Sequence, residues 1–164
     1  DNPSTRIGKK PRHVPTKVSR DKAATIFDLD DFHRPAKQEP VDFEQHNPHT
    51  IHDVAHGLIW QQSGSPYPLD WHTAREYISR LNRENFGWID KWRLPTVDEL
   101  ICLIQPKTVL GDYCQPEVFD NQKNRLWSSD KKSYTSAWYV HTDMGYADSQ
   151  DMTCRFYVRA VSDA

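Results

Sequence analysis

Four histidines lie close together in the sequence: His46, His49, His52 and His56. Neutral imidazole is a good ligand for zinc, copper and nickel, so this cluster raises the possibility of a metal site. Pro48 prevents one helix from presenting all four rings on one face, and an extended segment would divide them between two faces. We therefore expect no metal site, and the four histidines remain weak candidates as ligands.

The segment between Asp130 and Thr153 combines aromatic rings with charged and polar side chains. Aromatic faces pack on sugar rings and polar neighbours orient the hydroxyls, so this mixture can bind a glycan. It equally suits a protein interface, where Tyr and Trp are enriched. We expect Trp138 itself to lie in the core. The candidate ligand-binding residues are Lys131, Lys132, Tyr134, Tyr139, His141, Asp143, Tyr146 and Asp148.

The sequence contains none of the short motifs that mark common catalytic sites. Gly-x-Ser-x-Gly, His-Glu-x-x-His and the Walker A pattern do not occur. Carboxylates are plentiful, but a glycosidase pair is defined by separation in space rather than along the sequence. We expect a protein that is not an enzyme and that uses no cofactor.

The three cysteines do not have the spacing of a zinc site. Cys102 falls in a helical pattern and is expected to be a small buried residue. Cys114 and Cys154 lie in less regular stretches and could form a disulfide in an oxidising compartment. The sequence leaves that pairing open, because it does not fix the separation of the two Cα atoms.

Composition indicates one domain with an extension. The chain has 164 residues, of which 37% are hydrophobic and 12% aromatic, and a net charge of −2. Residues 1–20 carry six Lys and Arg against one acid, while the rest is acidic, so we expect no nucleic-acid partner. No apolar run is long enough for a membrane span. Because the first residue is Asp1, we expect a processed form or a piece of a longer protein.

Residues 1–47 are predicted to form an extended, proline-rich arm. Apolar residues are sparse, and short apolar stretches occur only at 24–27 and 41–43. Such a segment cannot bury enough surface to fold alone, so it would become ordered only along a partner or along its own domain. The prolines that interrupt it are Pro3, Pro11, Pro15, Pro35 and Pro40.

Residues 48–164 are predicted to form an α+β domain. One helix is expected from Trp71 to Arg83 with Asp70 as its N-cap, and a second from Thr96 to about Ile104, where Thr96 and Glu99 form a capping box. Strands are expected at 57–62, after a tight glycine turn, and at 125–129, 137–142 and 155–161.

Several motifs resemble one bacterial family, the Lcl C-terminal domain, which is found on collagen-like adhesins and many exported proteins. The most distinctive is Trp92-Arg93-Leu94-Pro95-Thr96-x-x-Glu99-Leu100, and it follows an opening motif at 53–61. Three strand motifs complete the resemblance at 127–129, 137–140 and 158–161. We interpret the defining residues as a structural framework: Trp60, Trp92, Arg93, Pro95, Thr96, Glu99, Trp127 and Trp138.

The resemblance implies a C-type-lectin-like fold, with two helices beside a twisted antiparallel sheet and long loops. It also implies an extracytoplasmic location, in the periplasm or at the cell surface, and binding of a polysaccharide or a partner protein. The alternative is a structural accessory subunit of a larger assembly, docked through residues 1–47. Two positions depart from the family pattern: Ala160 replaces a common Cys, and His56 replaces a Thr.

Overall fold

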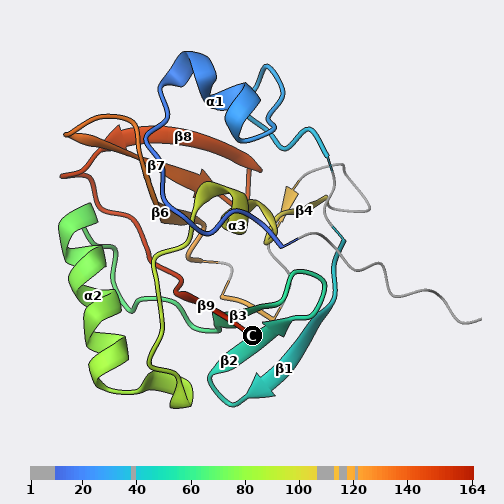
Figure 1. Ribbon diagram of the computed structural model, residues 1–164, viewed down its shortest axis with the longest axis vertical. Helices are drawn as coiled ribbons and strands as arrows, with labels where there is room; N and C mark the ends of the chain where they lie inside the picture. Colours follow the sequence, from blue (N-terminus) through green and yellow to red (C-terminus); the bar gives the residue numbers. More distant parts are fainter. Residues whose placement is uncertain (1–9, 38–39, 107–112, 115–117, 121) are drawn as a thin grey trace, which may run out of the picture.

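Two antiparallel sheets organise the protein, as the computed structural model shows for residues 10–37, 40–106, 113–114, 118–120 and 122–164 (Figure 1). The four-stranded sheet has the order β1-β2-β3-β9, and the three-stranded sheet has the order β6-β7-β8. The architecture is α+β, as predicted. The strands of the two sheets are β1 (Phe43–Asn47), β2 (Thr50–Asp53), β3 (Leu58–Gln61), β9 (Val161–Asp163), β6 (Arg125–Lys131), β7 (Ser136–His141) and β8 (Tyr146–Asp151).

Three α-helices, one 3₁₀ turn and one short pair of strands complete the described fold. The helices are α1 (Arg20–Ile26), α2 (Trp71–Arg83) and α3 (Val97–Ile101), and a 3₁₀ turn, η1, spans Phe86–Trp88. A short antiparallel pair joins β4 (Gln105–Pro106) to β5 (Tyr113–Cys114).

Both helix predictions are confirmed at their N-termini. The carboxylate of Asp70 accepts a hydrogen bond of 2.8 Å from Thr73 N and caps α2. Thr96 and Glu99 form the reciprocal capping box of α3, which ends at Ile101, three residues earlier than expected.

The three-stranded sheet is covered on both faces. Trp138 and Val140 of β7 pack in one hydrophobic cluster, while Ala137 and Tyr139 pack in the other. Because both faces are buried, the strand is apolar at successive positions and shows no solvent-facing alternation. Figure 1 shows α1 beside the three-stranded sheet. Phe27, which follows α1 directly, contacts the ring of Trp138 on this side of the sheet.

The expected strand at 155–161 is wrong over most of its length. Only β9, which begins at Val161, forms a regular ladder, with β3. The preceding residues hydrogen-bond in turn to different segments: Phe156 exchanges two hydrogen bonds with Leu69, and Tyr157 N donates to Arg125 O. A segment that changes partner every few residues links the two sheets but cannot continue one ladder.

This linking segment buries a charged side chain that the alternating pattern did not predict. Arg159 is fully buried and donates through Nη1 to the carbonyl oxygens of Gln61 and Gln62. Its guanidinium lies 4.7 Å from the ring centroid of Phe119. Burial lowers the pKa of Arg159 to about 10.

The N-terminal segment lies along the domain over its described residues. Val18 and Phe27 are buried in the same cluster as Trp138. Trp138 Nε1 donates to Val18 O at 2.8 Å, and the rings of Phe27 and Trp138 meet edge to face at 5.3 Å. Strand β1 also extends the sheet of residues 48–164. The segment predicted as an arm therefore contains a helix and a strand that pack on its own domain.

A buried carboxylate, that of Asp130, joins three separate segments. Its Oδ1 accepts hydrogen bonds from Arg12 Nη1 at 2.8 Å and Thr16 N at 2.9 Å. Its Oδ2 accepts from Arg12 Nη2 and from Val97 N, both at 2.8 Å. Thr96 Oγ1 in turn donates to Arg12 O at 2.7 Å. Asp130 thus connects the end of β6 with the start of α3 and with the N-terminal segment.

Replacing Asp130 with Asn should destabilise the protein by about 3 kcal/mol, because an amide nitrogen cannot accept and the Arg12 charge loses its buried partner. Urea denaturation measures this loss, and trypsin should cleave after Lys17 and Arg20 sooner. The matched control is Asp98→Asn, which removes a single half-buried bond to Arg12 and should cost under about 1 kcal/mol. Equal losses in the two variants would contradict the role of Asp130.

Candidate functional site

The candidate ligand-binding residues do not form one surface. Lys131, Lys132 and Tyr134 lie at the β6–β7 connection, whereas Asp143 and Tyr146 lie at the β7–β8 connection. Strand β7 separates the two groups by about 17 Å, at roughly 3.3 Å per residue. The two groups cannot contact one small ligand together.

Two of the candidates are part of the core. Tyr139 is 5% exposed and His141 is 7% exposed. The ring of Tyr139 lies 4.5 Å from that of Phe156, and burial raises the pKa of its phenol. His141 Nδ1 accepts a hydrogen bond from Met144 N at 3.1 Å, and burial lowers the pKa of His141. Covering both faces of the sheet is what removes these side chains from solvent.

The remaining candidates are exposed or partly exposed, and three of them contact residues far away in the sequence. Tyr134 is 91% exposed, and Lys17 Nζ lies 5.3 Å from its ring centroid. Lys131 Nζ lies 5.2 Å from the ring of Trp71, and Asp148 lies 4.0 Å from Arg20.

The four histidines occupy different environments. His46 and His52 come from neighbouring strands, and their rings lie 6.3 Å apart. His49 lies beside Phe86, and His56 is buried against a carboxylate. Across the part of the chain that the structure describes, no three His, Cys, Asp or Glu side chains are grouped as metal ligands.

An open groove of about 320 Å³ runs beside α2, and we call it the α2 groove. One wall is the segment that leads into the helix, and the other is a stripe of helix residues at spacings of three and four. Arg80 lies over the ring of Tyr77 at 5.4 Å, and Gln61 Nε2 donates to the Tyr77 hydroxyl at 2.7 Å. The lining residues are Pro66, Tyr67, Leu69, Thr73, Glu76, Tyr77, Arg80 and Arg83.

The sequence contained one signal for this groove. Thr73, Tyr77 and Arg80 recur at helical spacing on α2, next to the buried stripe that includes Ile78. Sequence reasoning identified the helix and its N-cap but assigned no role to this face. The opposite wall could not be predicted, because it depends on where the chain places Tyr67 after β3.

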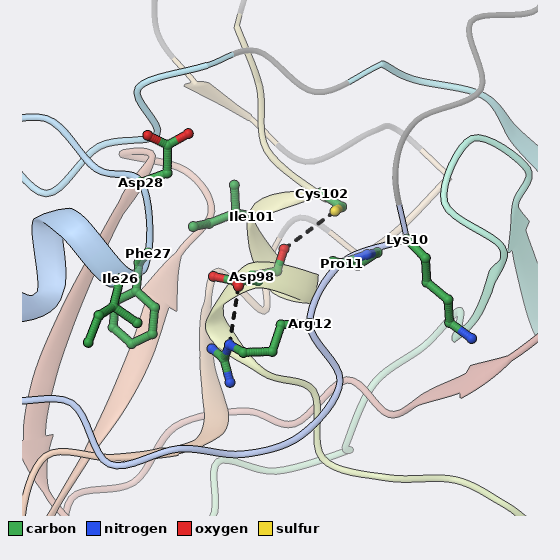
Figure 2. Close-up of a pocket in the computed structure, with 9 residues that line it drawn as sticks. All are labelled: Lys10, Pro11, Arg12, Ile26, Phe27, Asp28, Asp98, Ile101 and Cys102. Carbon is green, nitrogen blue, oxygen red and sulfur yellow. Dashed lines mark hydrogen bonds and ion pairs between the residues drawn. The ribbon is translucent and has the colours of Figure 1, made fainter.

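A second pocket, of about 330 Å³, lies where the N-terminal segment crosses α3 (Figure 2). Asp98 occupies its centre, where Oδ2 accepts from Arg12 Nε at 3.2 Å and the backbone oxygen accepts from Cys102 Sγ at 3.4 Å. Burial raises the pKa of Asp98, and the nearby Arg12 charge opposes that shift. Arg12 is hydrogen-bonded to both Asp98 and Asp130. We therefore interpret this pocket as a packing gap between two segments of one chain.

Comparison with known protein families matches residues 49–162 to the Lcl C-terminal domain. The chain belongs to this family. No curated protein matches the chain.

The most distinctive Lcl motif builds structure around α3. Trp92 is buried; its backbone N–H donates to Asn82 Oδ1 at 2.6 Å, and its Nε1 donates to Phe86 O at 3.0 Å. Arg93 forms ion pairs with Glu99 and Asp163. These contacts join α2, η1, α3 and β9, which fits the framework interpretation. The other framework residues are also buried: Trp60, Thr96, Trp127 and Trp138, together with Pro95.

The two departures from the Lcl pattern lie at buried positions. His56 Nδ1 lies 3.0 and 2.9 Å from the two carboxylate oxygens of Asp53, at the turn where Gly57 adopts a φ of +68°. Ala160 is fully buried. Cys154 carries a free thiol, whereas the side chain of Cys114 lies outside the described residues.

The cap of α2 should make the stability of this Lcl domain depend on pH. The backbone bond from Thr73 lowers the pKa of Asp70, so its carboxylate stabilises the protein above about pH 4, and this contribution is lost as the pH falls through the lowered pKa. Asp70→Ala should cost about 1 kcal/mol at pH 7. The difference from the wild type should shrink at acid pH, as measured by urea denaturation.

The control for this experiment is Asp31→Ala, which removes an exposed carboxylate away from α2. It should leave the free energy of unfolding almost unchanged at both pH values. A deficit in Asp70→Ala that stays constant down to the acid limit would contradict the role of the ionised cap.

Proposed function

We propose that this protein is a non-catalytic recognition domain that binds a polysaccharide, and that the α2 groove is its binding site. The observation that carries the proposal is the combination of two tyrosines with two arginines in one open groove. The proposal includes a C-type-lectin-like arrangement and an extracytoplasmic location, which the family resemblance implies.

The lining of the α2 groove favours a sugar chain with negative charges. Tyr67 is largely exposed, so its face is available to the C–H bonds of a sugar ring. Arg80 and Arg83 place guanidinium groups along the same wall, and guanidinium binds sulfate and carboxylate groups through paired hydrogen bonds. The exposed ring of Tyr67 and the two guanidinium groups together favour an anionic polysaccharide over a neutral one.

The same lining supports binding rather than hydrolysis. Glu76 is the one carboxylate among the described residues that line the groove. Most glycosidases need two carboxyl groups on either side of the scissile bond. A single exposed carboxylate can orient the hydroxyl groups of a sugar, but it does not supply the two carboxyl groups that hydrolysis needs.

Docking as an accessory subunit through residues 1–47 receives less support. Val18 and Phe27 are buried within the domain, and Arg12 is held by Asp130. A partner that used this segment would first have to compete with those contacts.

As for the membrane, none of the described helices has the length and apolar character needed to cross one.

The proposal is tested by calorimetry with chondroitin sulfate as an anionic probe and dextran as a neutral one. Arg80→Gln should weaken chondroitin sulfate binding about tenfold, because it removes a charge-assisted hydrogen bond. The matched control is Arg75→Gln, which removes the same charge from the same helix outside the groove. We expect little change in the control variant.

Two results would contradict the proposal. Equal weakening by Arg75→Gln would show that only the net charge of the protein matters. If neither probe binds, the polysaccharide proposal is wrong, and a protein partner would then be the ligand to seek.

A further inference from the structure

One tryptophan of the six is accessible to solvent. Trp88 is 71% exposed, whereas the other five are at most 3% exposed. Burial of a ring this large would stabilise the fold, and all of the others are buried accordingly. Trp88 therefore contributes little to the core, and the reason for a tryptophan at this position lies elsewhere.

The backbone at Trp88 also disfavours a bulky residue. Its φ is +62°, in the left-handed region, as are those of Asn85 at +52° and Gly87 at +59°. Gly and Asn adopt this conformation at low cost, whereas a bulky side chain there is an outlier. Strained positions of this kind cluster at functional sites.

The turn that carries Trp88 is held firmly from both sides. The carbonyl oxygen of Phe86 accepts from Trp92 Nε1 at 3.0 Å, and that of Gly87 accepts from Asn47 Nδ2 at 3.2 Å. A Cβ on Gly87 would lie 2.8 Å from Cγ2 of Thr50, so the β1–β2 turn packs directly on η1. The exposed indole is therefore presented from a fixed backbone.

His49 adds a polar group beside the indole. It lies on the β1–β2 turn, and its ring centroid is 6.3 Å from that of Trp88 and 5.5 Å from that of Phe86. An imidazole provides one donor and one acceptor at a short distance from the aromatic face. The pair combines an apolar surface with hydrogen-bonding capacity.

We propose that Trp88 and His49 form a second sugar-binding position, in which the indole stacks on the C–H face of a pyranose ring and His49 hydrogen-bonds a hydroxyl. The inference rests on the proposed polysaccharide binding and names an uncharged part of the ligand. The C–H bonds of a pyranose carry partial positive charge, which the electron-rich indole face attracts. A flat face of this kind is typical of β-linked glucose units.

The surroundings of Trp88 favour a sugar over a protein. The core of a protein interface is a contiguous apolar patch, with charged residues depleted. Trp88 instead lies among exposed polar residues, including Asn85, Asp90 and Lys91. Trp88 follows Arg83 of the α2 groove by five residues, so their Cα atoms lie within about 18 Å of each other, a distance that several units of one sugar chain can span.

The exposure pattern provides a direct test. Because the other tryptophans are buried, acrylamide quenching of tryptophan fluorescence reports mainly on Trp88. We would use the whole chain with cellohexaose and chondroitin sulfate as probes, and measure binding of each by calorimetry in parallel. The expected result is that a probe that binds also protects Trp88 from acrylamide.

Three variants separate stacking from folding. Trp88→Ala should weaken binding roughly tenfold, as truncation of an aromatic anchor does, while Trp88→Phe should retain most of the affinity. Trp88→Asn should also lose binding, yet unfold at a urea concentration equal to or above that of the wild type, because Asn suits a positive φ. Retained stability would exclude misfolding as the cause.

The two proposals fail in different ways. Binding by calorimetry with Trp88 still fully quenched, or with Trp88→Ala unaffected, would overturn this inference and leave the α2 groove as the site. Binding that both Arg80→Gln and Trp88→Ala weaken would support the two positions together. If neither cellohexaose nor chondroitin sulfate binds, both this inference and the proposed function are overturned.

Discussion

The buried carboxylate of Asp130 is the interaction on which the rest of the structure depends. An ionised group without solvent must have its hydrogen bonds satisfied by the protein, and each oxygen of Asp130 accepts two. Those four bonds fix the start of α3 and the path of the N-terminal segment against β6. With the segment fixed, Val18 and Phe27 cover Trp138 and close one face of the three-stranded sheet.

Closing that face decides where the protein can contact a ligand. A sheet covered on both sides offers only its ends and its edges, so the aromatic side chains of β7 serve the core. The exposed aromatic residues lie on connections outside the sheets, and two of them flank α2: Tyr67 before it and Trp88 after it. Both candidate binding positions thus lie at α2, which the cap at Asp70 and the contacts of Trp92 hold in place.

Sequence reasoning succeeded where the deciding interaction is local. Asp70 and the Thr96–Glu99 capping box act within one helical turn, so they predict where α2 and α3 begin. It failed where the deciding interaction joins residues that are far apart in the sequence. Arg12 and Asp130 are separated by 118 positions, and no local pattern connects them. Tyr139 and His141 were also assigned to a surface, because the sequence pattern did not show that the rings of Phe156 and Tyr146 pack against them.

The pairing of β3 with β9 has a consequence for the order of folding. Trp60 of β3 aligns with Val161 of β9, so the four-stranded sheet gains this strand only after nearly all of the intervening chain has been made. Contacts between such distant residues require closure of a long loop, which slows folding. During synthesis on the ribosome, β3 has no partner on the side where β9 will pair until β9 has been made. An unpaired strand edge of this kind can pair with other chains. Pairing of β9 with β3 covers this edge and removes it as a site of aggregation.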